Sequence, residues 1–267
     1  MKKYLLFLIA FSFFAQCYSQ IKGIPMQSME FAPKTITFLA YDAFDYAYTI
    51  ENNVFKKSKG SENWEYKNVT LGKITKVDLQ NPLKIVLFYE DFNTVILLDN
   101  QLNESQKINF SEHPTPINAT AVGIAGQNQL WVYNNLNQQI GMYDYLKNEY
   151  KTISTPLAGK VKNYTTDFNS FIWMDHNGEG YSCSLFGAIE NLGKFPVADQ
   201  LQIISSNQML YSIDQKITLL TRQKDKSWAS TTLQLPEKRF EKFYYQAQIL
   251  AIFTTEGIYN FKIILIS

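Results

Sequence analysis

The chain has 267 residues, of which 46% are hydrophobic and 18% are charged. This balance excludes an intrinsically disordered chain, which would be poorer in apolar residues and richer in charge. Lysine plus arginine (25) nearly equals aspartate plus glutamate (24), so net charge gives no support to binding of nucleic acid or of an anionic membrane. We therefore expect no nucleic-acid partner.

The N-terminus has the pattern of a secretory signal peptide. Two lysines follow the first methionine, residues 4–15 form an apolar run, and residues 17–19 (Cys-Tyr-Ser) form a small-x-small cleavage site. The run is shorter than the roughly twenty apolar residues that span a bilayer, and no later stretch is long enough. We therefore predict a signal peptide over 1–19, one domain over 20–267, no transmembrane segment in the mature chain, and a periplasmic or outer-membrane-associated location.

The cysteines leave one alternative open at this end of the chain. Lipidation at Cys17 normally requires a small residue just before the cysteine, and here that residue is Gln16. If cleavage follows Ser19, Cys183 is the single remaining cysteine, so no intramolecular disulfide can form and the core must hold the fold. Cys183 lies in the alternating run 181–186, which predicts a buried small side chain rather than a nucleophile.

The rest of the chain repeats one pattern: an apolar strand, a turn rich in Asn, Asp or Gly, an alternating strand, and then a more polar strand. The apolar strands are expected at residues 46–50, 84–89, 128–133, 170–174, 207–211 and 248–253. The hairpin turns that follow them are expected at residues 51–53, 90–93, 134–137, 176–178, 214–215 and 255–257. The period of about forty residues is typical of a β-propeller blade.

These repeats predict an all-β fold, a single β-propeller of about six four-stranded blades. A ring of five or seven blades, or a pair of β-sandwiches, is the alternative, because weakly similar repeats are difficult to count. The last unit ends at 257–263 without a polar outer strand, while residues 21–31 precede the first full unit. Pairing of these two terminal segments would complete the last blade and close the ring.

The search for catalytic, cofactor and metal motifs finds none that is specific. His113 and His176 have no histidine or cysteine at metal-ligand spacing. Residues 175–180 resemble the start of an EF-hand loop, but the twelfth position is Phe186 instead of the bidentate Glu, which favours a hairpin turn. Nucleophile-elbow, phosphate-loop and dinucleotide motifs are missing. We therefore assign no catalytic, cofactor-binding or metal-binding residues.

Two sets of side chains could still gather at the axis of a propeller. The aspartates that could line a central channel, where hydrolases of this fold place acids, are Asp42, Asp45, Asp91, Asp144, Asp167 and Asp175. Turn capping explains most of them equally well. Among four tryptophans, Trp131 and Trp173 share one strand position in successive repeats. This shared position predicts that they pack in the core before it predicts that they bind a ligand.

The signal peptide ending in Tyr18-Ser19-Gln20, together with the units at 81–85 and 98–104, resembles exported β-propeller proteins of Bacteroidota with WD40/YVTN-like repeats. The resemblance covers most of the chain and implies the architecture, with no particular activity. We expect a non-catalytic cell-envelope scaffold or protein-interaction module with an envelope protein as partner. The alternative is a channel-centred hydrolase or carbohydrate-binding propeller, which three acids at one mouth, or an acid pair beside an exposed tryptophan, would favour.

Overall fold

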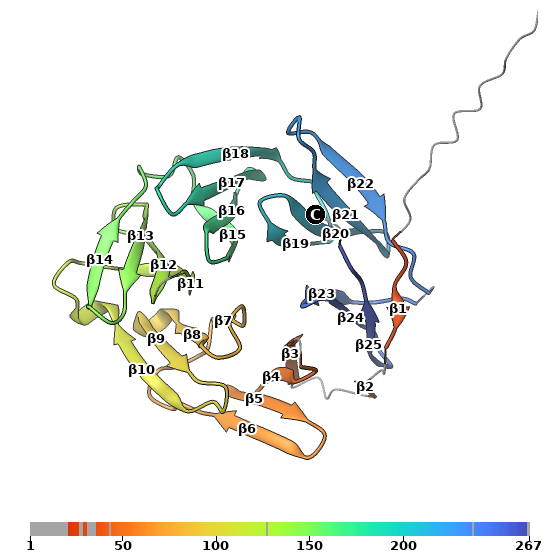
Figure 1. Cartoon of the computed structure of the whole chain (residues 1–267), viewed down its shortest axis with the longest axis horizontal. Coiled ribbons are helices and arrows are strands. Elements are labelled where there is room, and N and C mark those ends of the chain that lie inside the picture. The colour runs from red at the N-terminus through yellow and green to blue at the C-terminus, as the bar shows by residue number, and fades with distance from the viewer. Residues whose placement is uncertain are drawn as a thin grey trace, which may run out of the picture.

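The computed structural model describes residues 21–26, 29–30, 36–42, 44–126, 128–236 and 238–265. Six antiparallel sheets stand around a common axis, so the chain is a six-bladed β-propeller (Figure 1). The predicted all-β fold and blade number are confirmed, and the five-bladed, seven-bladed and sandwich alternatives are not. Within the described ranges the helical segments are two single 3₁₀ turns, η1 (Glu90–Phe92) and η2 (Phe110–Glu112).

Blades 1 to 5 each contain four consecutive strands that run from the axis outward (Figure 1). Blade 1 consists of β3 (Ile36–Tyr41), β4 (Ala47–Glu51), β5 (Val54–Lys59) and β6 (Glu62–Tyr66). Blade 2 consists of β7 (Lys76–Asp78), β8 (Ile85–Tyr89), β9 (Thr94–Leu98) and β10 (Glu104–Asn109). Blade 3 consists of β11 (Ala119–Ile124), β12 (Gln129–Asn134), β13 (Gln139–Asp144) and β14 (Glu149–Thr152). Blade 4 consists of β15 (Val161–Thr166), β16 (Ser170–Asp175), β17 (Glu179–Ser184) and β18 (Ile189–Lys194). Blade 5 consists of β19 (Gln200–Ser205), β20 (Gln208–Ile213), β21 (Lys216–Arg222) and β22 (Trp228–Thr232).

Blade 6 is built from both ends of the chain. Its inner strands are β23 (Lys242–Gln246), β24 (Ile249–Phe253) and β25 (Gly257–Lys262). Its outer position is shared by β1 (Ile24–Pro25) and β2 (Met29–Glu30), both antiparallel to β25. This pairing confirms the predicted ring closure, and it covers the edge of β25 that would otherwise offer unpaired N–H and C=O groups.

The second strand of each blade is the apolar strand that the repeat predicts. All five residues of β8 are buried, and so are all five of β9, because neighbouring blades cover both faces of these strands. The outer strand β6 alternates exposed and partly covered residues instead. The turns between second and third strands are tight hairpins, and Asn52 and Asn53 adopt φ of 49° and 63° there.

The core is a set of apolar layers between adjacent blades. One layer joins blades 2 and 3 and contains Phe88, Val122 and Leu130. The layer between blades 3 and 4 contains Trp131 and Trp173, which are 0% and 2% exposed, so the prediction that they pack is confirmed. Each blade therefore depends on both of its neighbours for burial of its faces.

Residues 1–20 lie outside the described residues, and with them the predicted signal peptide and Cys17. Export, cleavage and lipidation therefore stay predictions. Within the described part of the chain, no helix has the length and apolar character needed to cross a membrane.

Cys183 lies on β17 in the layer between blades 3 and 4 and is 0% exposed, as the alternating sequence predicts. Burial raises the pKa of its thiol to about 11. We therefore expect the folded mature chain at pH 8 to react with a thiol reagent such as Ellman's reagent only after unfolding, because the thiolate is the reactive form. Rapid stoichiometric labelling of the native protein would contradict this assignment.

Candidate functional site

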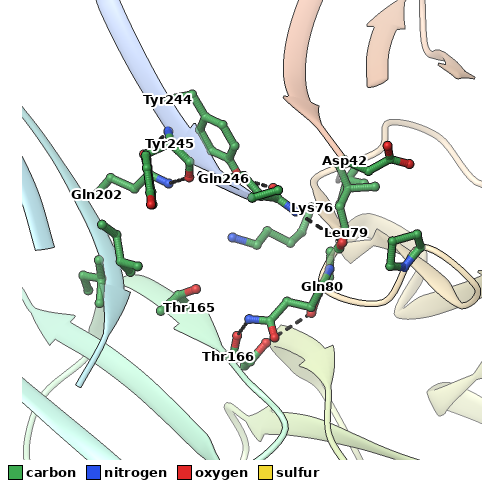
Figure 2. Close-up of a pocket in the computed structure, with 16 residues that line it drawn as sticks. Asp42, Lys76, Leu79, Gln80, Thr165, Thr166, Gln202, Tyr244, Tyr245 and Gln246 are labelled. Carbon is green, nitrogen blue, oxygen red and sulfur yellow. Dashed lines mark hydrogen bonds between the residues drawn. The ribbon is translucent and has the colours of Figure 1, made fainter. Parts of the chain in front are cut away.

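One cavity lies on the propeller axis, where innermost strands of several blades face one another. It has a volume of about 400 Å³ and is lined by residues of β7, β15, β19 and β23 and the turns after them (Figure 2). The turns that join first to second strands open at this mouth, which we call the turn mouth. Its charged lining residues are Asp42, Lys76 and Asp78.

Side-chain amides join the innermost strands of blades 5 and 6, which do not form a ladder with each other. The Gln202 amide accepts from the Tyr245 N–H at 2.8 Å and donates to the Tyr245 carbonyl at 2.6 Å. Gln200 makes the same two bonds to Phe243, at 2.9 and 2.5 Å. A primary amide offers the donor and acceptor of a peptide group, so each glutamine replaces one missing ladder position.

Asp78 connects three blades at the axis. Its Oδ1 accepts from the Gln80 N–H at 2.9 Å, and its Oδ2 accepts from the Ile124 N–H at 2.8 Å and the Thr166 hydroxyl at 3.2 Å. Gly123 permits this approach, because a Cβ there would lie 1.9 Å from the Thr166 Oγ1. Burial raises the pKa of the Asp78 carboxyl, while its hydrogen bonds and Lys76 oppose that shift.

The connection after β7 also spans the axis. The Gln80 side chain donates to the Thr166 carbonyl of blade 4, and the Gln246 side chain of blade 6 donates to the Leu79 carbonyl at 3.2 Å (Figure 2). Residues 78–80 of blade 2 therefore link blades 4 and 6 through hydrogen bonds, which narrows the space along the axis at this level.

Lys76 is the cation among the described residues that line the pocket. Its Nζ stands 4.7 Å from the centroid of the Tyr164 ring, a cation–π contact, and it has no hydrogen-bond acceptor among the described residues. Burial lowers the pKa of this ammonium, and Asp78 partly offsets the effect. Tyr164 is itself held in place, because its hydroxyl bonds the N–H and carbonyl of Val122 at 3.1 and 3.2 Å.

A second cavity of about 750 Å³ opens toward the other mouth of the ring, between blades 1 and 2. Lys76, Val77, Leu79 and Tyr244 line both cavities, so these residues separate the two. The connections between successive blades lie at this mouth, which we call the linker mouth.

Of the six aspartates considered from sequence, Asp42 is the one that lines the turn-mouth cavity. It is 3% exposed and accepts from the N–H groups of Phe44 and Tyr46 and from the Tyr48 hydroxyl, at 2.8, 3.1 and 2.9 Å. Its carboxylate is therefore occupied by its own turn.

The other five aspartates lie in turns or at the ends of strands. Asp144, Asp167 and Asp175 cap the turns after their strands by accepting backbone N–H groups, which confirms turn capping for these three. Asp175 bonds the N–H groups of Asn177 and Glu179, so the EF-hand-like stretch is a hairpin turn, as predicted. Asp45 precedes β4 with φ of 65°, and Asp91 lies in η1.

The histidines and tryptophans lie away from the cavity. His113, after η2, contacts the backbone carbonyls of Thr115 and Asn148, and His176 lies in the turn after β16. The described residues contain no group of three or more His, Cys, Asp or Glu side chains that could hold a metal ion.

Lys76 and Asp78 were missed in the sequence because β7 has only three residues and precedes the conspicuous apolar strand of its blade. The usable signal was two charged residues at i and i+2, which lie on one face of a strand directed at the axis.

The sequence matches no protein-family model and no curated protein. Comparison with solved structures gives a clear answer for the fold. The similar structures are β-propellers. Virginiamycin B lyase from Staphylococcus aureus matches with a TM-score of 0.57 and 12% identity, over 88% of this chain and 82% of the lyase.

Two further propellers align over nearly their whole length. YCF48 bound to D1 peptide matches with a TM-score of 0.56 and 10% identity, over 92% of this chain and 100% of YCF48. The Cps50 (Swd1) propeller domain of Myceliophthora thermophila matches with a TM-score of 0.54 and 9% identity, over 89% of this chain and 99% of that domain. At these identities the similarity establishes the fold alone.

Proposed function

We propose that this protein is a non-catalytic interaction module of the cell envelope that binds a segment of a partner protein over its turn mouth. The observation that carries the proposal is a rim of exposed apolar side chains there. Phe44, Leu83 and Phe168 are 65%, 70% and 42% exposed and lie in first-to-second-strand turns of blades 1, 2 and 4. Exposed apolar groups in turns at the mouth of the axial cavity favour contact with a partner there.

Two of the rim residues are close in sequence to residues that line the axial cavity. Phe44 follows Asp42 by two residues, and Leu83 directly follows Pro82; both Asp42 and Pro82 line the cavity. A partner segment laid across the rim would bury apolar surface at the edge and reach polar groups at the centre, as in protein interfaces with a few anchoring side chains.

The chemistry of the cavity supports binding over catalysis. Asp42 and Asp78 both accept hydrogen bonds from the chain itself, so each carboxylate has a structural role in the fold. A virginiamycin B lyase structure with quinupristin carries a catalytically inactive histidine-to-alanine variant, whereas no histidine lines this cavity. The YCF48 structure holds a peptide, which supports peptide binding by a propeller of this kind. The signal peptide expected over 1–19 supports an envelope partner.

The proposal is tested by affinity purification of the tagged protein from crosslinked native envelopes, with Phe44→Ser/Leu83→Ser as the test variant. We expect capture of a stoichiometric partner to fall about tenfold, because both side chains belong to the rim. The matched control is Val69→Ser/Val197→Ser, since these residues are 79% and 91% exposed but lie in the connections between blades. Equal loss in both variants, or capture unaffected by either, would refute the rim as the binding surface.

The alternative function is a channel-centred hydrolase or carbohydrate-binding propeller, which the presence of Asp42 and Asp78 in one cavity favours. No tryptophan lines that cavity, so the acid pair lacks the aromatic platform that sugar recognition would use. Recovery of an unaccompanied protein, followed by hydrolysis or glycan binding that disappears in Asp42→Asn, would replace the interaction proposal with this one.

A further inference from the structure

The linker-mouth cavity has an unusual charge pattern that the interaction proposal does not use. Among the described residues that line it, the charged ones are Lys73 and Lys76, and none is a carboxylate. Glu90 is close by, since its backbone N–H donates to the Thr75 hydroxyl at 3.2 Å, but its side chain does not line the cavity. The other mouth, by contrast, has two carboxylates around the same lysine.

The charged groups that line this cavity are hydrogen-bond donors. The Lys76 ammonium lacks an acceptor among the described residues and is held over the Tyr164 ring at 4.7 Å. The Asn53 amide is occupied, because it donates to the Gly72 carbonyl at 2.6 Å and accepts from the Ile74 N–H at 2.9 Å. A half-buried ammonium without an acceptor favours a ligand that brings a negative charge.

The remaining walls are apolar. Leu39 and Ile50 of blade 1 face Ile74, Val77 and Leu79 of blade 2 across the cavity. An ion such as phosphate would leave this surface in contact with water, whereas an acid with an aliphatic body would cover it.

From the unpaired Lys76 ammonium, the absence of lining carboxylates and the apolar walls, we propose that this cavity binds a carboxylate carried on an apolar group. The carboxylate accepts hydrogen bonds from the Lys76 Nζ, with Lys73 contributing at the entrance, and the apolar group packs between blades 1 and 2. Two sources have this chemistry: the C-terminal residue of a peptide and a free organic acid. The site opens at the mouth opposite the apolar rim and shares Lys76 with the turn-mouth cavity, so it involves none of the rim residues.

The test is an NMR titration of the mature chain with isotope-labelled Ile, Leu and Val methyl groups. The probes are N-acetyl-leucine, its uncharged amide, and a hexapeptide that ends in leucine with a free carboxylate. N-acetyl-leucine is expected to shift the methyl signals of Ile50 and Ile74 with a Kd on the order of millimolar, and the amide to bind about tenfold more weakly. Ile203 and Ile204, which line the other cavity, should not shift. Tighter binding of the hexapeptide identifies a C-terminus as the natural source, and equal binding identifies a free acid.

Lys76→Met is the decisive variant. It keeps the length and apolar stem of the side chain but removes the cation beside the buried Asp78 carboxyl, so circular dichroism is used to confirm that the variant folds before its binding is measured. We expect its affinity for N-acetyl-leucine to fall about tenfold. Lys147→Met, at a 67% exposed lysine of blade 3, is the control and should bind normally.

Four results would overturn the proposal: no methyl shift at about 20 mM acid, well above the expected Kd; equal binding of the amide; unchanged affinity in Lys76→Met; or equally strong binding of inorganic phosphate at the same methyl groups. The last result would make the cavity a general anion site without selectivity for an apolar body.

Discussion

Removal of residues 20–31 from the mature chain is expected to lower the melting temperature by about 10 °C or more. The deletion takes away β1 and β2, and therefore every outer-strand partner of β25. It also removes the hydrogen bonds from the Met26 N–H to the Asn260 carbonyl and from the Gln234 N–H to the Ile21 carbonyl, at 2.8 and 3.0 Å. The edge of blade 6 then meets water, and Phe261, now 3% exposed, loses part of its cover.

The measurement is thermal unfolding followed by circular dichroism, with Ile24→Ser as the control. Ile24 is 62% exposed, so this variant retains the strand pairing and should melt within about 2 °C of the unaltered chain. Gly23→Val should fall between the two, because a Cβ at Gly23 would lie 2.7 Å from Leu235 Cδ2. Identical melting of the deleted and full mature chains would show that the ring does not depend on its terminal strands.

Asp78→Ala is expected to reduce the free energy of unfolding by about 3 kcal/mol. The change leaves the N–H groups of Gln80 and Ile124 and the Thr166 hydroxyl without their acceptor at the centre of the ring. It also removes the carboxylate that offsets the desolvation of Lys76. Urea unfolding at pH 7 measures the loss, and a change below about 0.5 kcal/mol would mean that water replaces the carboxylate at little cost.

Asp78→Asn separates the charge of this residue from its hydrogen bonds. Burial raises the folded-state pKa of Asp78 above its ordinary value. The contribution of this shift to the free energy of unfolding is therefore complete below about pH 4 and is lost as the pH rises through the folded pKa. Asparagine does not titrate, and it keeps one carbonyl acceptor. The stability gap between the unaltered protein and Asp78→Asn should therefore narrow between about pH 4 and pH 7. A gap that widens over this range would mean that hydrogen bonds to the carboxylate outweigh its desolvation.

The repeat pattern was readable in the sequence because each blade places its second strand between two neighbouring blades. Such a strand has to be apolar on both faces, as β8 shows, and the turn after it has to accept positive φ, as Asn52 and Asn53 do. Ring closure could also be predicted, because a last unit that lacks its polar outer strand needs a strand from elsewhere in the chain. The strand and turn patterns follow from residues that are neighbours in sequence, whereas closure pairs the two ends of the chain.

The candidate sites could not be predicted from the sequence in this way. Asp42 was one of six aspartates considered because hydrolases of this fold place acids in the central channel, and its carboxylate caps its own turn. Asp78 meets Thr166, 88 positions away, and Gln246 meets Leu79, 167 positions away. No local pattern reports which inner-strand side chains converge across a ring.

Local sequence therefore determines the blade period, the buried strands, the turns and the burial of Cys183, because each depends on residues within one repeat. The axial hydrogen-bond network, the unpaired ammonium of Lys76 and the different charge of the two mouths arise only when six blades close around an axis. Closure brings side chains from distant repeats within hydrogen-bonding distance, and burial at the axis then changes the free energy of their charges.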